Sequence, residues 1–208
     1  RWSVVRDSLE GEAGVATADL ATALRRSVEE AVSRRSPTHV FLHAGVVAAG
    51  DGALVIAGRS RSGKSTLVAA LIRQGARYLS DEFAPLDGEG FVHPFPRPLG
   101  IRPNRRDLPE PVPPQAFNAA VETEPLPVIG VALVQYSPDG RWAPEVRSQG
   151  EGVLGLLDNA VTAREQPERC LAVLDRAVAG ATVLVGERGD ADETAAALLA
   201  DPELWRRG

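Results

Sequence analysis

Several residue types and segment types are rare or missing in this chain of 208 residues, and each absence excludes something. Its one cysteine, Cys170, excludes an internal disulfide, and we expect this side chain to lie in the core. No apolar run approaches the roughly 18 residues that a membrane-spanning helix needs, and no apolar signal-peptide segment is present near Arg1. We therefore expect a cytoplasmic protein without membrane contact. Methionine is absent, so we expect further residues to precede Arg1.

Positive charge in this chain is carried almost entirely by arginine. Among the 23 basic residues there is one lysine, Lys64, and the 28 acidic residues leave a net charge of −5, which argues against general nucleic-acid binding. An ammonium group is a compact point charge on a flexible stem, whereas a guanidinium is a planar fork. Because the chain uses lysine only once, we expect position 64 to require a compact ammonium group rather than a guanidinium.

Lys64 belongs to the pattern G-x-x-x-x-G-K-S, which is typical of a phosphate-binding loop. The glycines let successive backbone N–H groups turn inward, and the N-terminus of the following helix adds the positive end of its dipole. We expect Lys64 to reach the β- and γ-phosphates, Ser65 to bind Mg²⁺ and Thr66 to support the start of the helix. The predicted nucleotide-binding residues are Gly58, Arg59, Ser60, Arg61, Ser62, Gly63, Lys64, Ser65 and Thr66.

The segments around the loop have the order that such a loop requires. The apolar residues 53–57 predict a buried strand, and residues 65–74 predict a helix. Residues 38–50 predict an earlier strand, joined to 53–57 by a hairpin at Gly50-Asp51-Gly52. Residues 76–80 predict the strand that follows the helix.

The rest of the chain predicts further helices and strands. An amphipathic helix is expected over 19–35, with Leu20, Leu24, Val28 and Val32 on its apolar face. A second hairpin is expected over 83–93, strands at 128–135 and 181–185, and helices at 152–161, 167–179 and 192–199. Residues 94–127 are rich in proline and arginine and predict an irregular loop or lid. Together these patterns predict one α/β domain over 1–208, with a mixed sheet flanked by helices.

Two acidic residues are candidates for the chemistry of phosphoryl transfer, in which a carboxylate often accepts the proton of the acceptor hydroxyl. Asp81 directly follows the predicted strand 76–80, and strand ends in α/β sheets gather ligands. Glu82 is its neighbour, and successive side chains of an extended chain point in opposite directions. We expect the two acids to serve different atoms. His43, in an apolar strand pattern, is either a hydrogen-bonded core residue or a site residue.

The ordered set of these motifs resembles the catalytic domain of bacterial HPr kinase/phosphorylase. The resemblance covers roughly residues 38–104 and rests on the His-Ala-Gly-Val stretch at His43, the hairpin into the phosphate loop and the acidic pair Asp81-Glu82. The stretch RPLGI, from Arg97 to Ile101, resembles the Arg-Gly-Leu-Gly-Ile signature of the family. The resemblance implies the P-loop fold of that family. It also implies that the histidine and the two acids line a site where a seryl hydroxyl is phosphorylated.

Three positions differ from the family pattern. Thr66 and Glu82 stand where the family has glutamate and aspartate, and Pro98 stands where its signature has glycine. The chain is more similar to shorter HPr-kinase-like proteins, some of which modify peptides such as lasso-peptide precursors. Arg97 and Arg102 are the candidate substrate-binding residues, because guanidinium groups bind phosphate and acidic partners through paired hydrogen bonds.

These features predict an ATP- and Mg²⁺-dependent kinase that transfers the γ-phosphoryl group to a hydroxyl, with a serine of a peptide or small protein as the expected acceptor. Lys64 binds phosphate, Asp81 accepts the proton and His43 positions Asp81, while Ser65, Asp81 and Glu82 are the candidate metal ligands. In a homo-oligomer, Arg59 or Arg61 could serve a neighbouring subunit as an arginine finger. Two alternatives stay open: a small-metabolite alcohol kinase of the same fold, and a nucleotide-responsive binding module without an acceptor.

Overall fold

The computed structural model describes residues 17–59, 62–102 and 109–205, and the chain divides into two compact units, Arg1–Pro37 and Thr38–Gly208. In the first unit, helix α1 (Thr17–Arg35) confirms the helix expected over 19–35. It ends before Pro37, whose ring disfavours a helical conformation in the residue that precedes it. Three residues of the predicted apolar face are more than half exposed, namely Leu24, Val28 and Val32.

The described part of the second unit alternates strands and helices in the manner of an α/β protein. The strands are β1 (Val40–Leu42), β2 (Ala44–Ala49), β3 (Gly52–Ala57), β4 (Arg77–Ser80), β5 (Ala84–Leu86), β6 (Phe91–Val92), β7 (Leu99–Ile101), β8 (Glu110–Val112), β9 (Leu126–Tyr136), β10 (Glu145–Arg147) and β11 (Thr182–Arg188). The helices are α2 (Lys64–Arg73), α3 (Gln149–Leu157), α4 (Pro167–Val178), α5 (Ala191–Ala200) and the 3₁₀ helix η1 (Pro114–Phe117).

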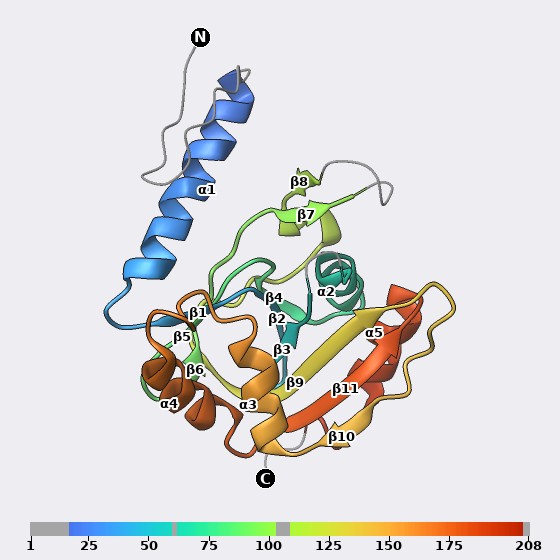
Figure 1. Ribbon diagram of the computed structural model, residues 1–208. Coiled ribbons are helices and arrows are strands. Elements are labelled where there is room, and N and C mark those ends of the chain that lie inside the picture. Colours follow the sequence, from blue (N-terminus) through green and yellow to red (C-terminus); the bar gives the residue numbers. More distant parts are fainter. Residues whose placement is uncertain (1–16, 60–61, 103–108, 206–208) are drawn as a thin grey trace. The chain divides into compact units, whose positions relative to one another are not determined.

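The main sheet is mixed and is built around the long strand β9 (Figure 1). Strand β9 pairs in parallel with β3 on one edge and with β11 on the other. Strand β2 lies antiparallel between β3 and β4, and β11 is also paired with β10. The first residues of β9 pair with β6, from which the sheet continues through β5 to β1. It follows that β3, β4, β9 and β11 run in the same direction and end at the same edge of the sheet.

Helices cover both faces of this sheet, with α2 and α5 packed on one face and α3 and α4 on the other (Figure 1). Strand β3 contributes side chains to both faces of the sheet, because alternate side chains of a strand point to opposite faces. Leu54 and Ile56 pack toward α2 and α5, whereas Val55 and Ala57 pack toward α3 and α4. All six residues of β3 are buried, as expected for a central strand with parallel pairing. The α/β class predicted from the sequence is confirmed.

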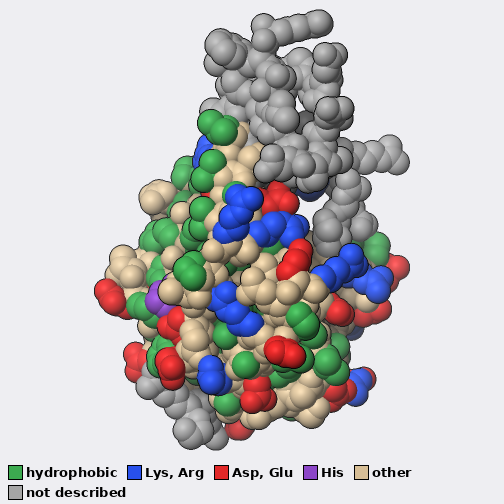
Figure 2. All heavy atoms as spheres, turned by 60° about the vertical axis from the view of Figure 1, so that its left-hand side comes forward, with side chains coloured by type: hydrophobic (Ala, Val, Ile, Leu, Met, Phe, Trp, Pro, Cys, Tyr) green, Lys and Arg blue, Asp and Glu red, His purple; other side chains and the backbone are tan. Residues whose placement is uncertain are grey.

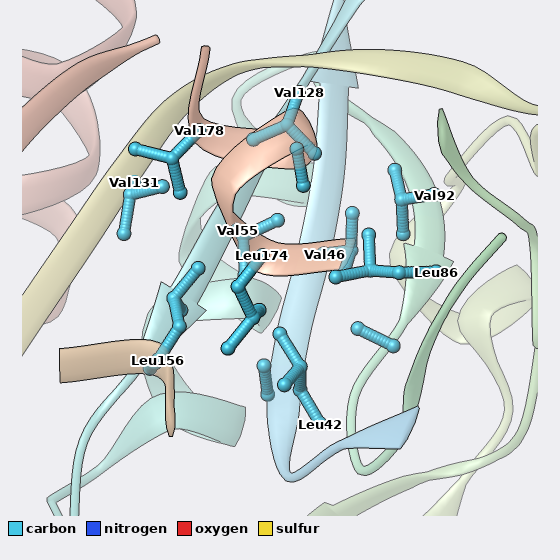
Figure 3. Packing of buried hydrophobic residues seen from close by; sticks show 14 of the residues in the cluster. Leu42, Val46, Val55, Leu86, Val92, Val128, Val131, Leu156, Leu174 and Val178 are labelled. Carbon is cyan, nitrogen blue, oxygen red and sulfur yellow. The ribbon is translucent and has the colours of Figure 1, made fainter. Parts of the chain in front are cut away.

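The apolar cluster on the α3 and α4 face is shown in Figure 3. Leu156 of α3 and Leu174 of α4 point toward Val46, Val55 and other side chains of the sheet. Cys170 is fully buried in the same cluster, with its Sγ atom 3.6 Å from the hydroxyl of Thr162. The expectation that Cys170 is a core residue is therefore confirmed.

Both predicted hairpins are present, and α3 both begins and ends earlier than the predicted 152–161, whereas the other predicted helices agree to within two residues at each end. Strands β2 and β3 pair from Ala49 and Gly52 outward, and β5 pairs with β6 through Leu86 and Val92. Helix α3 begins at Gln149 rather than at residue 152, because Ser148 and Glu151 form a capping box that satisfies the first backbone N–H groups. The short strand β10 was not predicted.

The expectation that residues 94–127 form an irregular loop or lid is wrong in part. Strands β7 and β8 form a two-stranded antiparallel ribbon in this segment, and η1 follows it. Prolines are tolerated because each strand of a two-stranded ribbon is an edge, where a missing N–H need not break a ladder. The segment is also tied to β4, since Tyr78 exchanges backbone hydrogen bonds with Ala120 and Glu122. Residues 103–108, between the two strands, lie outside the described residues.

Figure 2 shows acidic and basic side chains interspersed on one face of the molecule, with apolar side chains between them. Neither sign of charge gathers into a broad patch among the described residues of that face. In the part of the chain that the structure describes, no helix combines the length and the apolar character needed to cross a membrane.

Candidate nucleotide site

The candidate site lies where the four codirectional strands end. Strand β3 ends at Ala57, directly before the predicted phosphate loop, and β4 ends at Ser80, directly before Asp81. Strands β9 and β11 end next to each other, with Tyr136 paired to Arg188. Ligands of α/β proteins bind at the carboxyl ends of the strands, so this edge is where a nucleotide is expected.

Two loop positions require glycine in the structure. A Cβ atom on Gly58 would overlap the backbone oxygen of Val134 on β9. Gly63 has φ 76° and ψ 26°, in the left-handed region, and a Cβ atom there would overlap the guanidinium of Arg188. The two glycines of the motif therefore serve the path of the backbone. Ser60 and Arg61 lie outside the described residues.

Lys64 is the first residue of α2, and its ammonium lies across the loop. Its Nζ atom donates to the backbone oxygens of Gly58, at 2.8 Å, and Arg59, at 3.2 Å. Partial burial lowers the pKa of the ammonium, and the nearby Asp81 carboxylate opposes part of this shift. The ammonium and the N-terminus of α2 therefore both contribute positive charge to the loop.

Other loop side chains differ in exposure. Ser62 is 7% exposed, and its hydroxyl oxygen is buried without a hydrogen-bond partner among the described residues. Arg59 and Thr66 are exposed. Of these three side chains, that of Ser62 faces the interior of the loop structure.

Asp81 is the most buried acidic group of the site, with 7% of its surface exposed. Its Oδ2 atom accepts a hydrogen bond from the Gly100 N–H at 3.1 Å, and the Ser65 hydroxyl lies near the carboxylate. The other oxygen, Oδ1, is buried and has no hydrogen-bond partner in the described part of the chain. Burial raises the pKa of the Asp81 carboxyl, and the hydrogen bond from Gly100 and the nearby Ser65 hydroxyl oppose that rise. A buried carboxylate with an unpaired oxygen can bind a cation or accept a proton.

Ser65 and Asp81 fit the requirements of a Mg²⁺ ion. Magnesium takes few ligands from the protein and completes its coordination with phosphate and water oxygens. Within residues 17–59, 62–102 and 109–205, no group of three His, Cys, Asp or Glu side chains could hold a metal ion. A Mg²⁺ ion at this site would therefore arrive with a nucleotide rather than in an all-protein cage.

Glu82 and Arg97, predicted as a metal ligand and a substrate-binding residue, form an ion pair with each other at 3.2 Å. The side chain of Glu82 is 40% exposed, whereas that of Asp81 is buried, so the two neighbouring acids have different surroundings. The backbone oxygen of Arg97 accepts a hydrogen bond from the Tyr78 hydroxyl at 2.8 Å. Arg102, the second predicted substrate-binding residue, follows β7 and is exposed.

A hollow of about 360 Å³ borders this ion pair. It is lined mainly by proline, namely by Pro96, Pro98, Pro113 and Pro114, with Arg97 among them. Arg97 and Pro98 directly precede β7, which contains the Gly100 that donates to Asp81. Two residues of its lining therefore lie within three positions of the N–H group that donates to Asp81.

His43 does not lie in a strand, contrary to the prediction of one strand over 38–50. The chain bends at His43 because β1 pairs with β5, whereas β2 pairs with β3 and β4. The His43 N–H donates to the Asn159 oxygen at 2.8 Å, and its exposed ring lies 5.0 Å from that of Phe83 between centroids. Phe83 is two residues beyond Asp81, and a role of His43 toward Asp81 stays a prediction.

Arg188 was not predicted as a site residue, although it lies against the phosphate loop. It ends β11 and is 2% exposed, and its guanidinium donates to the backbone oxygen of Gly63 at 2.8 Å. A possible signal in the sequence is its place at the end of an apolar strand, before Gly189. That signal is weak, because it does not say that β11 ends beside the loop.

Comparisons with known proteins add little to this geometry. No family model and no curated protein matches the chain. Among solved structures, the chain is similar to the Hpr(Ser) kinase/phosphatase from Coxiella burnetii, with 16% identity and a TM-score of 0.39, over 74% of this chain and 88% of that chain. Because a similarity at this level carries no argument about function, the functional conclusion rests on the residues of the site.

Proposed function

We propose that this chain is an ATP-dependent kinase that transfers the γ-phosphoryl group to a hydroxyl, with a serine of a peptide or small protein as the acceptor. The observation that supports this most is the place of Asp81, a buried carboxylate beside Ser65 and Lys64 of the phosphate loop. Burying a carboxylate is costly unless it is paired. A phosphotransferase can use such a group in the reaction, as the base that takes the proton of the acceptor hydroxyl.

Each residue of the site has a role in the proposed transfer. Lys64 and the backbone N–H groups of the loop bind the β- and γ-phosphates. The acceptor oxygen forms a bond to the γ-phosphorus while the bond from that phosphorus to its bridging oxygen breaks, and ADP leaves. Asp81 takes the proton of the acceptor hydroxyl. A raised pKa favours this role, because a general base is most effective when its pKa lies near the working pH.

Ser65 and Asp81 are the residues proposed to hold Mg²⁺, which when bound would neutralise the negative charge of the phosphates. Glu82 can reach the same region, but in the proposal its main partner is Arg97. We assign Arg97 to the acceptor side of the site, where its guanidinium can exchange Glu82 for an acidic group of the acceptor. His43 is proposed to position Asp81.

The hollow beside Arg97 supports a peptide acceptor over a small metabolite. Sites for small molecules bury most of the ligand surface, with a few polar groups placed around it. The hollow is lined by four proline rings, with Val121, the Gln115 amide and the Arg97 guanidinium beside them, which suits the side chains of an extended peptide. Arg102, exposed at the end of β7, is available to the same acceptor.

The test compares wild-type protein with Asp81→Asn in the presence of Mg²⁺, ATP and a library of serine-containing peptides. Intact-mass analysis of the peptides measures transfer, and calorimetric titration measures ATP binding. We expect Asp81→Asn to abolish transfer and to leave the affinity for ATP, titrated without Mg²⁺, nearly unchanged, because Lys64 and the loop N–H groups remain. Asp175→Asn, which changes an exposed acid of α4, is the matched control and should behave as the wild type.

Other outcomes would contradict parts of the proposal. ATP hydrolysis without any phosphorylated acceptor would indicate a nucleotide-responsive module. Phosphorylation of small alcohols but of no peptide would indicate a metabolite kinase. Comparable turnover in Asp81→Asn and wild type would remove Asp81 from the mechanism, and an absence of ATP binding would refute the nucleotide site itself.

A further inference from the structure

Arg188 connects the end of β11 to the turn of the phosphate loop, 125 residues away in sequence. Its Nη2 atom donates to the backbone oxygen of Gly63 at 2.8 Å and, more weakly, to that of Ser62 at 3.4 Å. Its Nη1 atom donates to the Gly189 oxygen at 2.9 Å. The guanidinium also lies over the ring of Tyr136, with 5.2 Å between its central carbon and the ring centroid. The side chain is thus held in one position by two strands and the loop.

This contact determines which way the loop amides point. A trans peptide unit is planar, and its C=O and N–H groups point in opposite directions. When Arg188 holds the carbonyls of Ser62 and Gly63, the N–H groups of Gly63 and Lys64 are turned away from the guanidinium. The Gly63 oxygen also accepts the first helical hydrogen bond, from the Leu67 N–H at 3.0 Å, which fixes the same orientation. Outward-turned carbonyls on one side leave donors on the other, as a phosphate-binding loop requires.

The second observation is that the charge of Arg188 has no acidic partner within ion-pair distance among the described residues. Two other arginines that join separate parts of the fold are paired with acids, Arg73 with Asp192 and Arg77 with Glu122. Arg188 has no such acid, and its buried Nε atom has no hydrogen-bond partner in the described part of the chain. Burial lowers the pKa of its guanidinium, and the fields of Tyr136 and Asp190 oppose this. A buried cation without an acidic partner is costly to the fold and is compensated when an anion binds nearby.

We propose that Arg188 is a positioning residue of the nucleotide site, which orients the loop amides toward the phosphates and adds positive charge behind them. The inference rests on the proposed nucleotide binding and deepens it, since it makes affinity depend on a residue outside the loop motif. Arg188 touches loop carbonyls rather than phosphate, so it acts through the loop. It favours ligands in proportion to their phosphate charge, which predicts a larger effect on ATP than on AMP.

The experiment measures the affinity of the full chain for ATP and for AMP by calorimetric titration with Mg²⁺ at two salt concentrations. Arg188→Met removes the charge and the hydrogen bonds, Arg188→Lys keeps the charge, and Arg188→Gln keeps a donor without charge. Arg176→Met is the matched control, because Arg176 also donates to a glycine carbonyl, that of Gly88, away from the loop. Circular dichroism and the unfolding midpoint of each variant report whether it is folded.

We expect Arg188→Met to bind ATP about ten- to a hundredfold more weakly than wild type, with a smaller loss for AMP and a weaker dependence on salt. Arg188→Lys and Arg188→Gln should lie between Arg188→Met and wild type, and Arg176→Met should match wild type. An effect on stability alone would leave ATP affinity unchanged in the folded fraction.

Wild-type ATP affinity in folded Arg188→Met would overturn the inference while leaving the proposed kinase intact. If Arg188→Met does not fold, Arg188→Lys and Arg188→Gln take its place in the test. Wild-type ATP affinity and wild-type salt dependence in both of these variants would then overturn the inference. An equal loss of affinity for ATP and AMP would also count against it. If wild-type protein binds no ATP, both this inference and the proposed function are wrong.

Discussion

Replacing Gly63 with alanine tests the structure of the phosphate loop most directly. Gly63 has φ 76°, and an L-residue in the left-handed region costs about 1–2 kcal/mol relative to its preferred conformations. The new Cβ atom would also occupy the place of the Arg188 guanidinium, which is 2% exposed. The guanidinium would have to leave its bond to the Gly63 oxygen, and a hydrogen bond that involves a charged group contributes about 1.5–3 kcal/mol.

The two effects add to a loss of about 2.5–5 kcal/mol in the free energy of unfolding for Gly63→Ala. Gly50→Ala is the matched control, since Gly50 has φ 56° and no atom lies within 4 Å of its added Cβ. It should lose about 1–2 kcal/mol, the backbone cost alone. Any change in the unfolded chain from glycine to alanine is the same in both variants and cancels in the comparison.

Urea unfolding monitored by circular dichroism measures both losses, and the difference between them is the steric effect of the Arg188 contact. A double-mutant cycle with Arg188→Ala isolates that effect further. In the Arg188→Ala background, Gly63→Ala should cost no more than Gly50→Ala. Equal losses for Gly63→Ala and Gly50→Ala in the wild-type background would refute the packing of Arg188 against the loop.

Three further predictions concern stability. Burial raises the pKa of Asp81 above its ordinary 3.8, so the folded chain loses stability as the pH rises through the raised value. The unfolding midpoint of Asp81→Asn should therefore exceed that of wild type at pH 7, and the difference should disappear in acid. Burial and the neighbouring His93 lower the pKa of His39 below its ordinary 6.5, so protonation favours the unfolded chain. His39→Asn should therefore lose less stability than wild type as the pH falls below 6.5, and an equal loss in the two proteins would contradict this prediction. Leu174→Ala, at a fully buried position of α4, should cost about 2–5 kcal/mol in urea unfolding, whereas Leu171→Ala, 39% exposed on the same helix, should cost much less.

Much of the fold could be predicted because it is encoded by neighbouring residues. The apolar run at 53–57 and the glycine that follows it predict a buried strand that ends before a turn, and β3 ends at Ala57. The capping box at Ser148 could have been found in the same way, but the prediction began α3 too late. Residues 94–127 were interpreted as irregular because proline is read as a strand breaker, which holds less strictly for a two-stranded ribbon.

Some features of the candidate site could likewise be predicted from neighbouring residues, and others could not. The sequence predicts that Asp81 follows a strand, and the codirectional ends of β3 and β4 explain why it lies beside Ser65. It does not predict that Glu82 pairs with Arg97, because their distance depends on how the chain at Arg97 is tied to Tyr78 of β4.

By itself, the sequence predicted the turn at Gly58, the strands and helices around it and the place of Asp81 after β4, since these depend on residues within a few positions of one another. The tertiary structure alone decided that Arg188 lies under the loop and that His43 falls at a bend, because both follow from which strands pair and where they end. Contacts between residues far apart in the chain leave no periodic pattern in the sequence. They form because the packed sheet brings the strand ends to one edge.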